Sequence, residues 1–220
     1  MFPPQLMPLF EDGRLKIPEQ PERNDPFLQY YQIWAIKHNV PESEIESIVP
    51  NPNDPWKHRN YENAHQFIKV EKSVLDIGCG SPSFSWERLR RPTHYFGLDS
   101  LYVESSSDIA LGVSEYLPIV SDSFENVTIL GVLDHVLDYA RAIDEAWRVL
   151  ENNGHLWLSA LAWTEHYELD RDIVHFHHFK EYELMGALRR FSIDAVQRFP
   201  WKEDYRTVLY VKAKKVASTG

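Results

Sequence analysis

Two glycines and an acid at the end of a short apolar run are the residues best suited to bind a ligand. Ser73–Ile77 contains Asp76 and leads directly into Gly78, Cys79 and Gly80. Glycines just beyond a buried strand let the backbone pass close beneath a ligand, with amide N–H groups aimed at it. The carboxylate of Asp76 disfavours a pyrophosphate at this turn and suits a cationic ligand. A tight turn that binds nothing remains the alternative interpretation.

A second acid, Asp99, ends the next predicted strand, 23 residues after Asp76. An acid at this point can accept hydrogen bonds from both hydroxyls of a ribose, in nicotinamide-cofactor sites and in other nucleoside sites alike. The two acids together predict a nucleoside site without specifying the nucleoside. A solvated acid at a strand end is the alternative for Asp99.

The elements that must position these residues alternate between strands and helices from Lys72 onward. Apolar runs predict strands over 73–77, 93–98, 126–130 and 155–159, and helical periodicity predicts helices over 84–91, 139–150 and 179–191. Such alternation predicts an α/β fold, a doubly wound and mostly parallel sheet with helices on both faces. The runs 193–199 and 207–213 predict a final antiparallel pair, which adds a C-terminal antiparallel strand.

The first part of the chain has a different composition, because most of the 14 prolines fall within residues 1–55. We expect residues 1–60 to form a Pro-rich helical extension, with short helices near 27–34 and 42–49, and residues 61–220 to form the main domain. The aromatic face of the first helix (Phe27, Tyr30, Tyr31 and Trp34) predicts either a lid over a ligand pocket or a structural helix packed on the sheet. A further helix is predicted over 61–68.

The overall charge excludes some classes of partner. There are 33 acidic and 23 basic residues, which gives a net charge of −10. This argues against binding to nucleic acid through its phosphate backbone. No stretch approaches the roughly 18 apolar residues of a membrane span, and the N-terminus lacks the pattern of a secretion signal. With a single cysteine that fits a reducing compartment, we expect a cytoplasmic protein that binds neither nucleic acid nor membrane.

Five segments in order resemble the class I S-adenosylmethionine-dependent methyltransferases, most closely the small-molecule group often called type 11. The likeness runs from about Tyr61 to Lys212. It includes the turn that holds the methionine part of the cofactor, the ribose-binding strand end, the stretch beside the adenine, the end of the fourth strand and the entry to the fifth. These are Val74–Gly80, Gly97–Asp99, Glu115–Ile119 with Ser123-Phe124, Ile129–His135 and Arg148–Leu156.

The resemblance implies a Rossmann-like fold, S-adenosylmethionine as the cofactor, and methyl transfer to oxygen or nitrogen of a small molecule. It also implies a set of cofactor-binding residues: Arg59, Tyr61, Asp76, Gly78, Cys79, Gly80, Asp99, Ser100, Glu115, Tyr116, Leu117 and Gly131. In this set Cys79 is expected to be a small residue of the turn rather than a nucleophile. Arg59 can equally belong to a charged helix start.

The sequence departs from the family pattern at three places. Ser81-Pro82-Ser83 stands where the first motif usually has its third glycine, and Val113 stands where an acid often reads the adenine amino group. The adenine contact is therefore expected from Glu115 or from the backbone. The short spacing between Asp99 and Leu117 predicts a trimmed connection around residues 102–108 and a more open sheet edge.

Two histidines are candidates for a general base. His135 follows the fourth predicted strand and has Asp134 beside it to orient the imidazole; the alternative is a histidine that packs or caps a helix start. His166 lies in the loop after the fifth strand, where a solvated loop is the alternative. His175, His177 and His178 suggest a metal site, but no carboxylate has the spacing of a metal triad, so no metal is expected.

Two rival functions stay open beside the methyltransferase. The missing third glycine and Val113 are compatible with a catalytically inactive module that binds the nucleoside or has a regulatory role. A nicotinamide-dependent oxidoreductase is disfavoured by Asp76 and by the same missing glycine. An amine, a phenol, a sugar or a natural-product scaffold would each fit the acidic and aromatic composition as the methyl acceptor, and the oligomeric state stays open.

Overall fold

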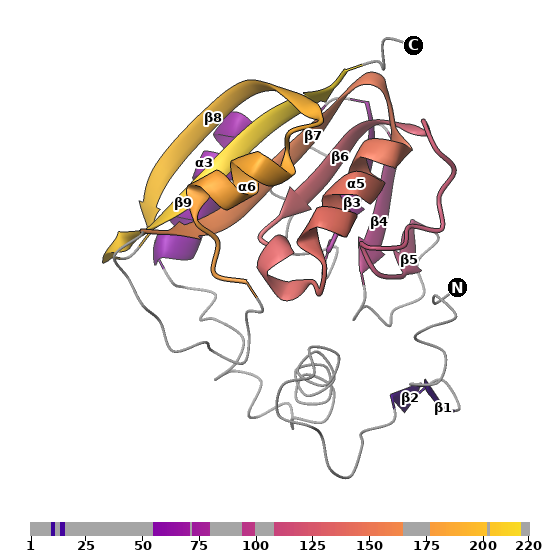
Figure 1. The fold of residues 1–220 in the computed structure, drawn as a ribbon, viewed down its shortest axis with the longest axis horizontal. Helices are drawn as coiled ribbons and strands as arrows, with labels where there is room; N and C mark the ends of the chain where they lie inside the picture. Colours follow the sequence, from indigo (N-terminus) through magenta and orange to yellow (C-terminus); the bar gives the residue numbers. More distant parts are fainter. Residues whose placement is uncertain are drawn as a thin grey trace.

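A mixed sheet of seven strands forms the centre of the molecule (Figure 1), in the order β5-β4-β3-β6-β7-β9-β8. The computed structural model describes residues 10–11, 14–15, 55–70, 72–79, 94–99, 108–164, 177–201 and 203–216. The strands of the sheet are β3 (Ser73–Ile77), β4 (His94–Asp99), β5 (Ile109–Leu111), β6 (Phe124–Leu130), β7 (Leu150–Trp163), β8 (Phe191–Trp201) and β9 (Glu203–Lys215). A separate antiparallel pair joins β1 (Phe10–Glu11) and β2 (Arg14–Leu15).

The strand directions confirm the predicted α/β class. β3, β4, β5, β6 and β7 pair in parallel, whereas β9 runs antiparallel to both of its neighbours, β7 and β8. The chain moves outward from β3 to β4 and β5, then returns to place β6 on the other side of β3. This reversal creates a topological switch point at the carboxyl ends of β3 and β6, which is where open α/β sheets bind ligands.

Helices cover both faces of the sheet, as Figure 1 shows: α5 (Tyr139–Val149) and α6 (Glu181–Ala187) lie on one face and α3 (Pro55–Phe67) on the other. A short 3-10 helix, η2 (Leu133–His135), follows β6. Helix α5 begins at a proper cap, because the Asp138 carboxylate accepts a hydrogen bond from the Arg141 N–H. Among the described residues, no helix has the length and hydropathy needed to cross a membrane.

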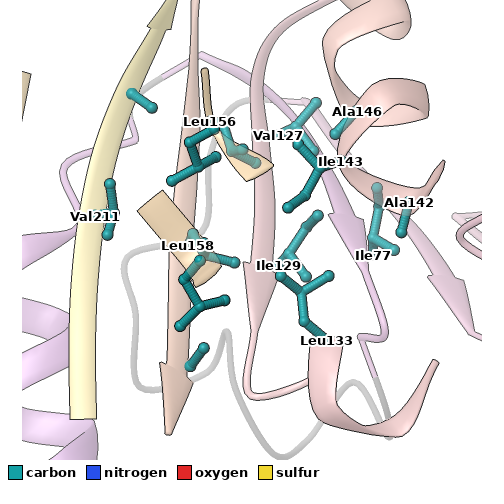
Figure 2. Packing of buried hydrophobic residues seen from close by; sticks show 14 of the residues in the cluster. Ile77, Val127, Ile129, Leu133, Ala142, Ile143, Ala146, Leu156, Leu158 and Val211 are labelled. Carbon is teal, nitrogen blue, oxygen red and sulfur yellow. The ribbon is translucent and has the colours of Figure 1, made fainter. Parts of the chain in front are cut away.

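The larger apolar core lies between the sheet and α5. Figure 2 shows side chains of β6 and β7 directed toward the helix, with Ile143 beside Val127. Alternate residues of each strand supply this layer because side chains of a strand point to opposite faces in turn. Ala142, Ile143, Ala146 and Val149 of α5 are buried, whereas Ala140 is exposed.

The second core lies under α3 and is rich in aromatic rings. The Phe67 ring packs edge-on against Trp157, with centroids 5.8 Å apart, and against Tyr210 at 5.7 Å. Val74 and Val208 complete the contact from the strands. This face also carries the buried polar side chains described below.

Helix α3 begins at Pro55, six residues before the predicted start at residue 61. A proline suits the first position of a helix, because an N–H at that position has no partner within the helix. Pro55 therefore starts the helix. Helix α3 also extends across the predicted boundary between residues 60 and 61. The helices predicted near 27–34, 42–49 and 84–91 lie outside the described residues.

Helix α6 and the edge of the sheet at β5 also differ from what the sequence predicts. Helix α6 ends at Ala187 rather than at residue 191, because Phe191 pairs with Lys215 and begins β8. At the other edge of the sheet, the three residues of β5 pair in parallel with the end of β4. The connection after Asp99 therefore still supplies an edge strand, although a short one.

Candidate functional site

The two predicted acids are buried at the carboxyl ends of neighbouring strands. Asp76 lies near the end of β3 and is 3% exposed, and Asp99 is the last residue of β4 and is 9% exposed. Since β3 and β4 run in parallel, both acids lie at the same edge of the sheet, next to the switch point. Carboxyl groups that are buried in this way require hydrogen-bond or charged partners.

The turn after β3 can be formed only by a glycine at position 78. Gly78 has a φ of +72°, and an added Cβ would lie 2.3 Å from Cγ2 of Val132. Its N–H donates a hydrogen bond of 2.7 Å to the Leu98 carbonyl, and the Cys79 N–H reaches the same oxygen at 3.3 Å. The backbone of this turn is therefore held against the end of β4, next to Asp99.

A second glycine leaves room above β6. Gly131 follows the strand with a φ of +66°, and a Cβ added there would meet no described atom within 4 Å. Its N–H donates to the Ser159 carbonyl at 2.9 Å, which fixes the turn against β7. The switch point is thus bordered by two turns in the conformation that glycine favours.

Cys79 is a buried residue of this turn. Burial raises the pKa of its thiol to about 12, and the negative charges of Asp76 and Asp99 add to this effect. The backbone places both acids beside the turn, because Asp76 precedes Gly78 by two residues and the Leu98 carbonyl that accepts from the turn is next to Asp99. A thiol with this pKa stays protonated near neutral pH, which agrees with a small packing residue and not with a nucleophile.

These residues fit a cofactor that carries both a positive charge and a ribose. Asp99 occupies the strand-end position of a sugar-binding acid, and Asp76 adds negative charge that suits a cation rather than a phosphate. The glycine at position 78 keeps side-chain atoms away from the turn. S-adenosylmethionine, with its sulfonium and its ribose, fits this combination.

Glu115 is held by the protein itself. One of its carboxylate oxygens accepts hydrogen bonds from the N–H groups of Leu137 (2.9 Å) and Asp138 (3.3 Å), and the other accepts one from the Ser114 hydroxyl at 2.9 Å. These bonds tie the segment after β5 to the start of α5. Tyr116, the next residue, is 46% exposed at the surface. Contacts of Glu115 and Tyr116 with the adenine stay predictions.

A buried ion pair that the motifs did not reveal supports the same segment. Glu145 of α5 accepts hydrogen bonds from the Leu117 N–H at 2.9 Å and from Arg148 at 2.8 and 2.9 Å. Arg148 also donates to the Leu117 and Ile119 carbonyls. Burial alone would raise the pKa of Glu145, but the hydrogen bonds from Arg148 and Leu117 bring it below its ordinary value. The spacing of Glu145 and Arg148, three apart on one helix, was the available signal.

His135 lies at the end of η2, directly after the switch point. Its Nε2 is 3.8 Å from Oδ1 of Asp134, so the predicted neighbour lies close to the imidazole but beyond hydrogen-bond distance. His177 fixes this turn, because its N–H donates to the Asp134 carbonyl and its Nε2 donates to the Val136 carbonyl at 2.8 Å. His135 therefore stays the candidate base, on a turn that is held in position.

The remaining predicted residues are placed as follows. Leu117 is buried, Arg59 is exposed on α3, and Tyr61 belongs to the same helix. Gly80, Ser100 and His166 lie outside the described residues, as does His175. Within the described ranges, no three histidine, cysteine or acidic side chains are grouped to hold a metal ion. Nε2 of His177 carries a proton, because its partner is a carbonyl, and this nitrogen is therefore not placed as a metal ligand.

Comparisons with known proteins agree with this geometry. The family model described as a methyltransferase domain matches residues 75–158, from β3 into β7. The ubiquinone biosynthesis O-methyltransferase of Hahella chejuensis is 32% identical over 103 residues, which cover 41% of this chain and 43% of that protein. A ubiquinone/menaquinone biosynthesis C-methyltransferase of Geotalea daltonii is 27% identical over 101 residues, 43% of each chain. The chain thus matches less than half the length of these curated relatives.

A solved structure extends the likeness over most of the fold. The 1,6-didemethyltoxoflavin-N1-methyltransferase of Burkholderia thailandensis, with bound 1,6-didemethyltoxoflavin and S-adenosylhomocysteine, is similar with a TM-score of 0.63 and 17% identity. The match covers 90% of this chain and 94% of that one. At this identity the likeness shows a shared fold, while the family model and the curated relatives give the kind of domain. Residues 75–158 therefore match a methyltransferase domain, and the fold is similar to that of a solved methyltransferase.

Proposed function

We propose that this protein transfers a methyl group from S-adenosylmethionine to an oxygen or nitrogen atom of a small molecule by in-line displacement. The observation that carries the proposal is the placement of buried Asp76 and Asp99 beside the turn at Gly78, at the switch point of the sheet. Asp99 would accept hydrogen bonds from the ribose hydroxyls, and Asp76 would supply negative charge near the cationic part of the cofactor.

The chain would act mainly by placement. When bound, the cofactor supplies an electrophilic methyl group on a positively charged sulfur. The protein must then hold the acceptor atom about 3–3.5 Å from that methyl group and in line with it, which removes much of the entropic cost of the reaction. The open space beyond Gly131, next to η2, is where we place the acceptor.

His135 would take the proton that an attacking hydroxyl or ammonium group must lose. A positioned base typically contributes about 10²–10⁴-fold to the rate. The carboxylate of Asp134, 3.8 Å away, would stabilise the imidazolium that forms. His166 is the second candidate for this role.

Three observations support a small-molecule acceptor. The relatives are named for ubiquinone and menaquinone biosynthesis, and the similar solved structure holds 1,6-didemethyltoxoflavin. The net charge of −10 disfavours nucleic acid as the acceptor.

The single cysteine fits a reducing compartment, so the cytoplasm stays the proposed location.

The test is to measure S-adenosylhomocysteine release with a panel of phenols, hydroxyquinones and heterocyclic amines, with mass spectrometry of each product to locate the new methyl group. We expect turnover on an oxygen or nitrogen acceptor, and a loss of about 10²–10⁴-fold in kcat for His135→Gln. Methylation on carbon alone would contradict the proposed acceptor atom. An unchanged kcat in His135→Gln would assign that histidine a structural role.

A module that binds the nucleoside without turnover is the second candidate. The observation that favours it is that both carboxylate oxygens of Glu115 already bond to the protein, while Val113 offers no acid for the adenine. This candidate predicts cofactor binding with no product from any acceptor of the panel. Catalytic turnover with one acceptor eliminates it.

A further inference from the structure

A buried polar cluster lies on the face of the sheet that α3 covers, directly behind the proposed cofactor turn. Three adjacent strands contribute to it: Tyr95 from β4, Asp76 from β3 and Thr128 from β6. The Thr128 hydroxyl donates to Oδ1 of Asp76 at 2.7 Å, and the Tyr95 hydroxyl donates to Oδ2 at 3.1 Å. Each carboxylate oxygen of Asp76 is thus held from one side by a neighbouring strand.

The register of the sheet makes this arrangement possible. Asp76 is paired with Thr128 on one side and with Gly97 on the other. A Cβ at Gly97 would lie 3.1 Å from the Tyr95 hydroxyl oxygen and 2.8 Å from Sγ of Cys79. The glycine opposite Asp76 therefore leaves the space that the Tyr95 hydroxyl and the Cys79 thiol occupy.

The chemistry of the two donors fixes their roles. A carboxylate offers about four lone-pair sites, so two hydroxyl donors orient Asp76 and leave it able to accept further hydrogen bonds. Burial, and after it the negative charge of Asp76, raises the pKa of Tyr95 far above its ordinary value, so its hydroxyl stays protonated and remains a donor. Thr128 has no exposed surface and carries a hydroxyl where its neighbours Val127 and Ile129 are apolar.

We propose that Tyr95 and Thr128 are positioning residues for the cofactor: their hydroxyls hold the Asp76 carboxylate ionised and oriented toward the cationic ligand. Neither residue lies in one of the five segments that resemble the family motifs, and the Tyr95 ring also packs against the core under α3. The role rests on the proposed function, because it requires that Asp76 meets S-adenosylmethionine. The competing explanation is that the two hydrogen bonds only stabilise the sheet.

The test compares variants that remove a hydroxyl with one that keeps it. The dissociation constant for S-adenosylmethionine and the Tm are measured for the wild type, Tyr95→Phe, Thr128→Val and Thr128→Ser. Val127→Ala is the matched control, because it weakens the same strand on the opposite face without touching Asp76. Tyr95→Phe is also measured in the Asp76→Asn background, at millimolar cofactor.

We expect Tyr95→Phe and Thr128→Val each to raise the dissociation constant about three- to tenfold, while Thr128→Ser stays within twofold of the wild type. Val127→Ala should lower the Tm and leave the affinity within twofold. In the Asp76→Asn background, Tyr95→Phe should raise the dissociation constant by less than a further twofold, because its effect passes through the carboxylate. If Asp76→Asn binds no cofactor, the comparison of Thr128→Val with Thr128→Ser decides whether the hydroxyl is required for affinity.

Three results would overturn the inference. Affinities of Tyr95→Phe and Thr128→Val within twofold of the wild type, in folded protein, would leave the hydrogen bonds a purely structural role. Equal loss in Thr128→Ser and Thr128→Val, or a full additional loss for Tyr95→Phe in the Asp76→Asn background, would show that the hydroxyls do not act through Asp76. A wild-type protein that binds no cofactor would instead refute the proposed function, and the positioning role with it.

Discussion

Asp99 is the residue whose removal should weaken cofactor binding most directly. Asp99→Asn keeps the shape of the side chain but removes the charge that would accept hydrogen bonds from the ribose. Hydrogen bonds to a charged group contribute about 1.5–3 kcal/mol each, so we expect the dissociation constant to rise about 10–100-fold. Equilibrium dialysis with labelled S-adenosylmethionine measures it. Asp144→Asn, which removes an exposed acid paired with Arg190, is the matched control and should bind like the wild type.

Cys79 offers a probe of the same turn, because it is the single cysteine of the chain. With a pKa of about 12, only about one thiol in ten thousand is ionised at pH 8, and the thiolate is the reactive form. We expect a disulfide reagent such as DTNB to react at least about 100-fold more slowly with the folded protein than with the protein in denaturant. Equal rates in the two states would contradict a thiol that is buried in this turn.

The sequence identifies the acids of the site better than their supporting residues. Asp76 and Asp99 follow apolar runs that could only be strands, so their place at the carboxyl edge of a parallel sheet follows from the pattern. Tyr95 and Thr128 could not be found this way, because their contact with Asp76 depends on the register between strands. Register is set by the whole sheet and not by the residues near the motif.

Within the elements, the Glu145 carboxylate connects α5 to the segment 115–121. Its folded-state pKa is lowered, so its contribution to stability is present above the ordinary pKa of about 4.5 and is lost as the pH falls through the folded value. Glu145→Gln should therefore cost about 1–3 kcal/mol at pH 7, and the difference from the wild type should shrink as the pH falls below 4.5. Urea unfolding at several pH values measures it.

The control for this experiment is Glu151→Gln, at an exposed acid of β7. It should change the free energy of unfolding by less than about 0.5 kcal/mol at every pH. A difference between Glu145→Gln and the wild type that stays constant down to pH 3 would contradict the assigned role of the ionised carboxylate.

The turn after β3 should tolerate no side chain at position 78. Gly78→Ala combines a φ of +72° with a Cβ placed 2.3 Å from Val132, so we expect a loss of about 1–3 kcal/mol in stability and weaker cofactor binding. Gly186→Ala in α6 is the matched control, because its Cβ would meet no described atom within 4 Å. It should be neutral or stabilise the helix by up to about 1 kcal/mol. Thermal unfolding of both variants checks this, and equal Tm values would contradict it.

The elements show where local patterns are reliable and where tertiary pairing decides. β3 was predicted to the residue, because its apolar run is bounded by Lys72 and Gly78. The end of α6 was not, because the pairing of Phe191 with Lys215 recruits that residue into β8. The start of α3 was predicted six residues too late, although Pro55 suits the first position of a helix.

For the whole molecule, the alternation of strands and helices was enough to predict a mostly parallel sheet with helices on both faces. The last two alternating runs also predicted an antiparallel pair. Neither pattern predicted that β9 would insert between β7 and β8, because several orders of a terminal hairpin satisfy the same pattern. The face that α3 covers was equally beyond the pattern, since that contact joins Phe67 to Trp157 and Tyr210, far apart in the sequence.

Isothermal titration of the wild-type protein with S-adenosylmethionine tests the central claim, that the site at the carboxyl ends of β3 and β4 binds this nucleoside. We expect a single saturable site per chain, with S-adenosylhomocysteine competing for it and a nicotinamide dinucleotide producing no binding heat. Saturation at 100 times the dissociation constant should also stabilise the fold by about 2.7 kcal/mol. If neither sulfur nucleoside produced heat or raised the Tm, or if the dinucleotide bound instead, the two buried acids would have another role.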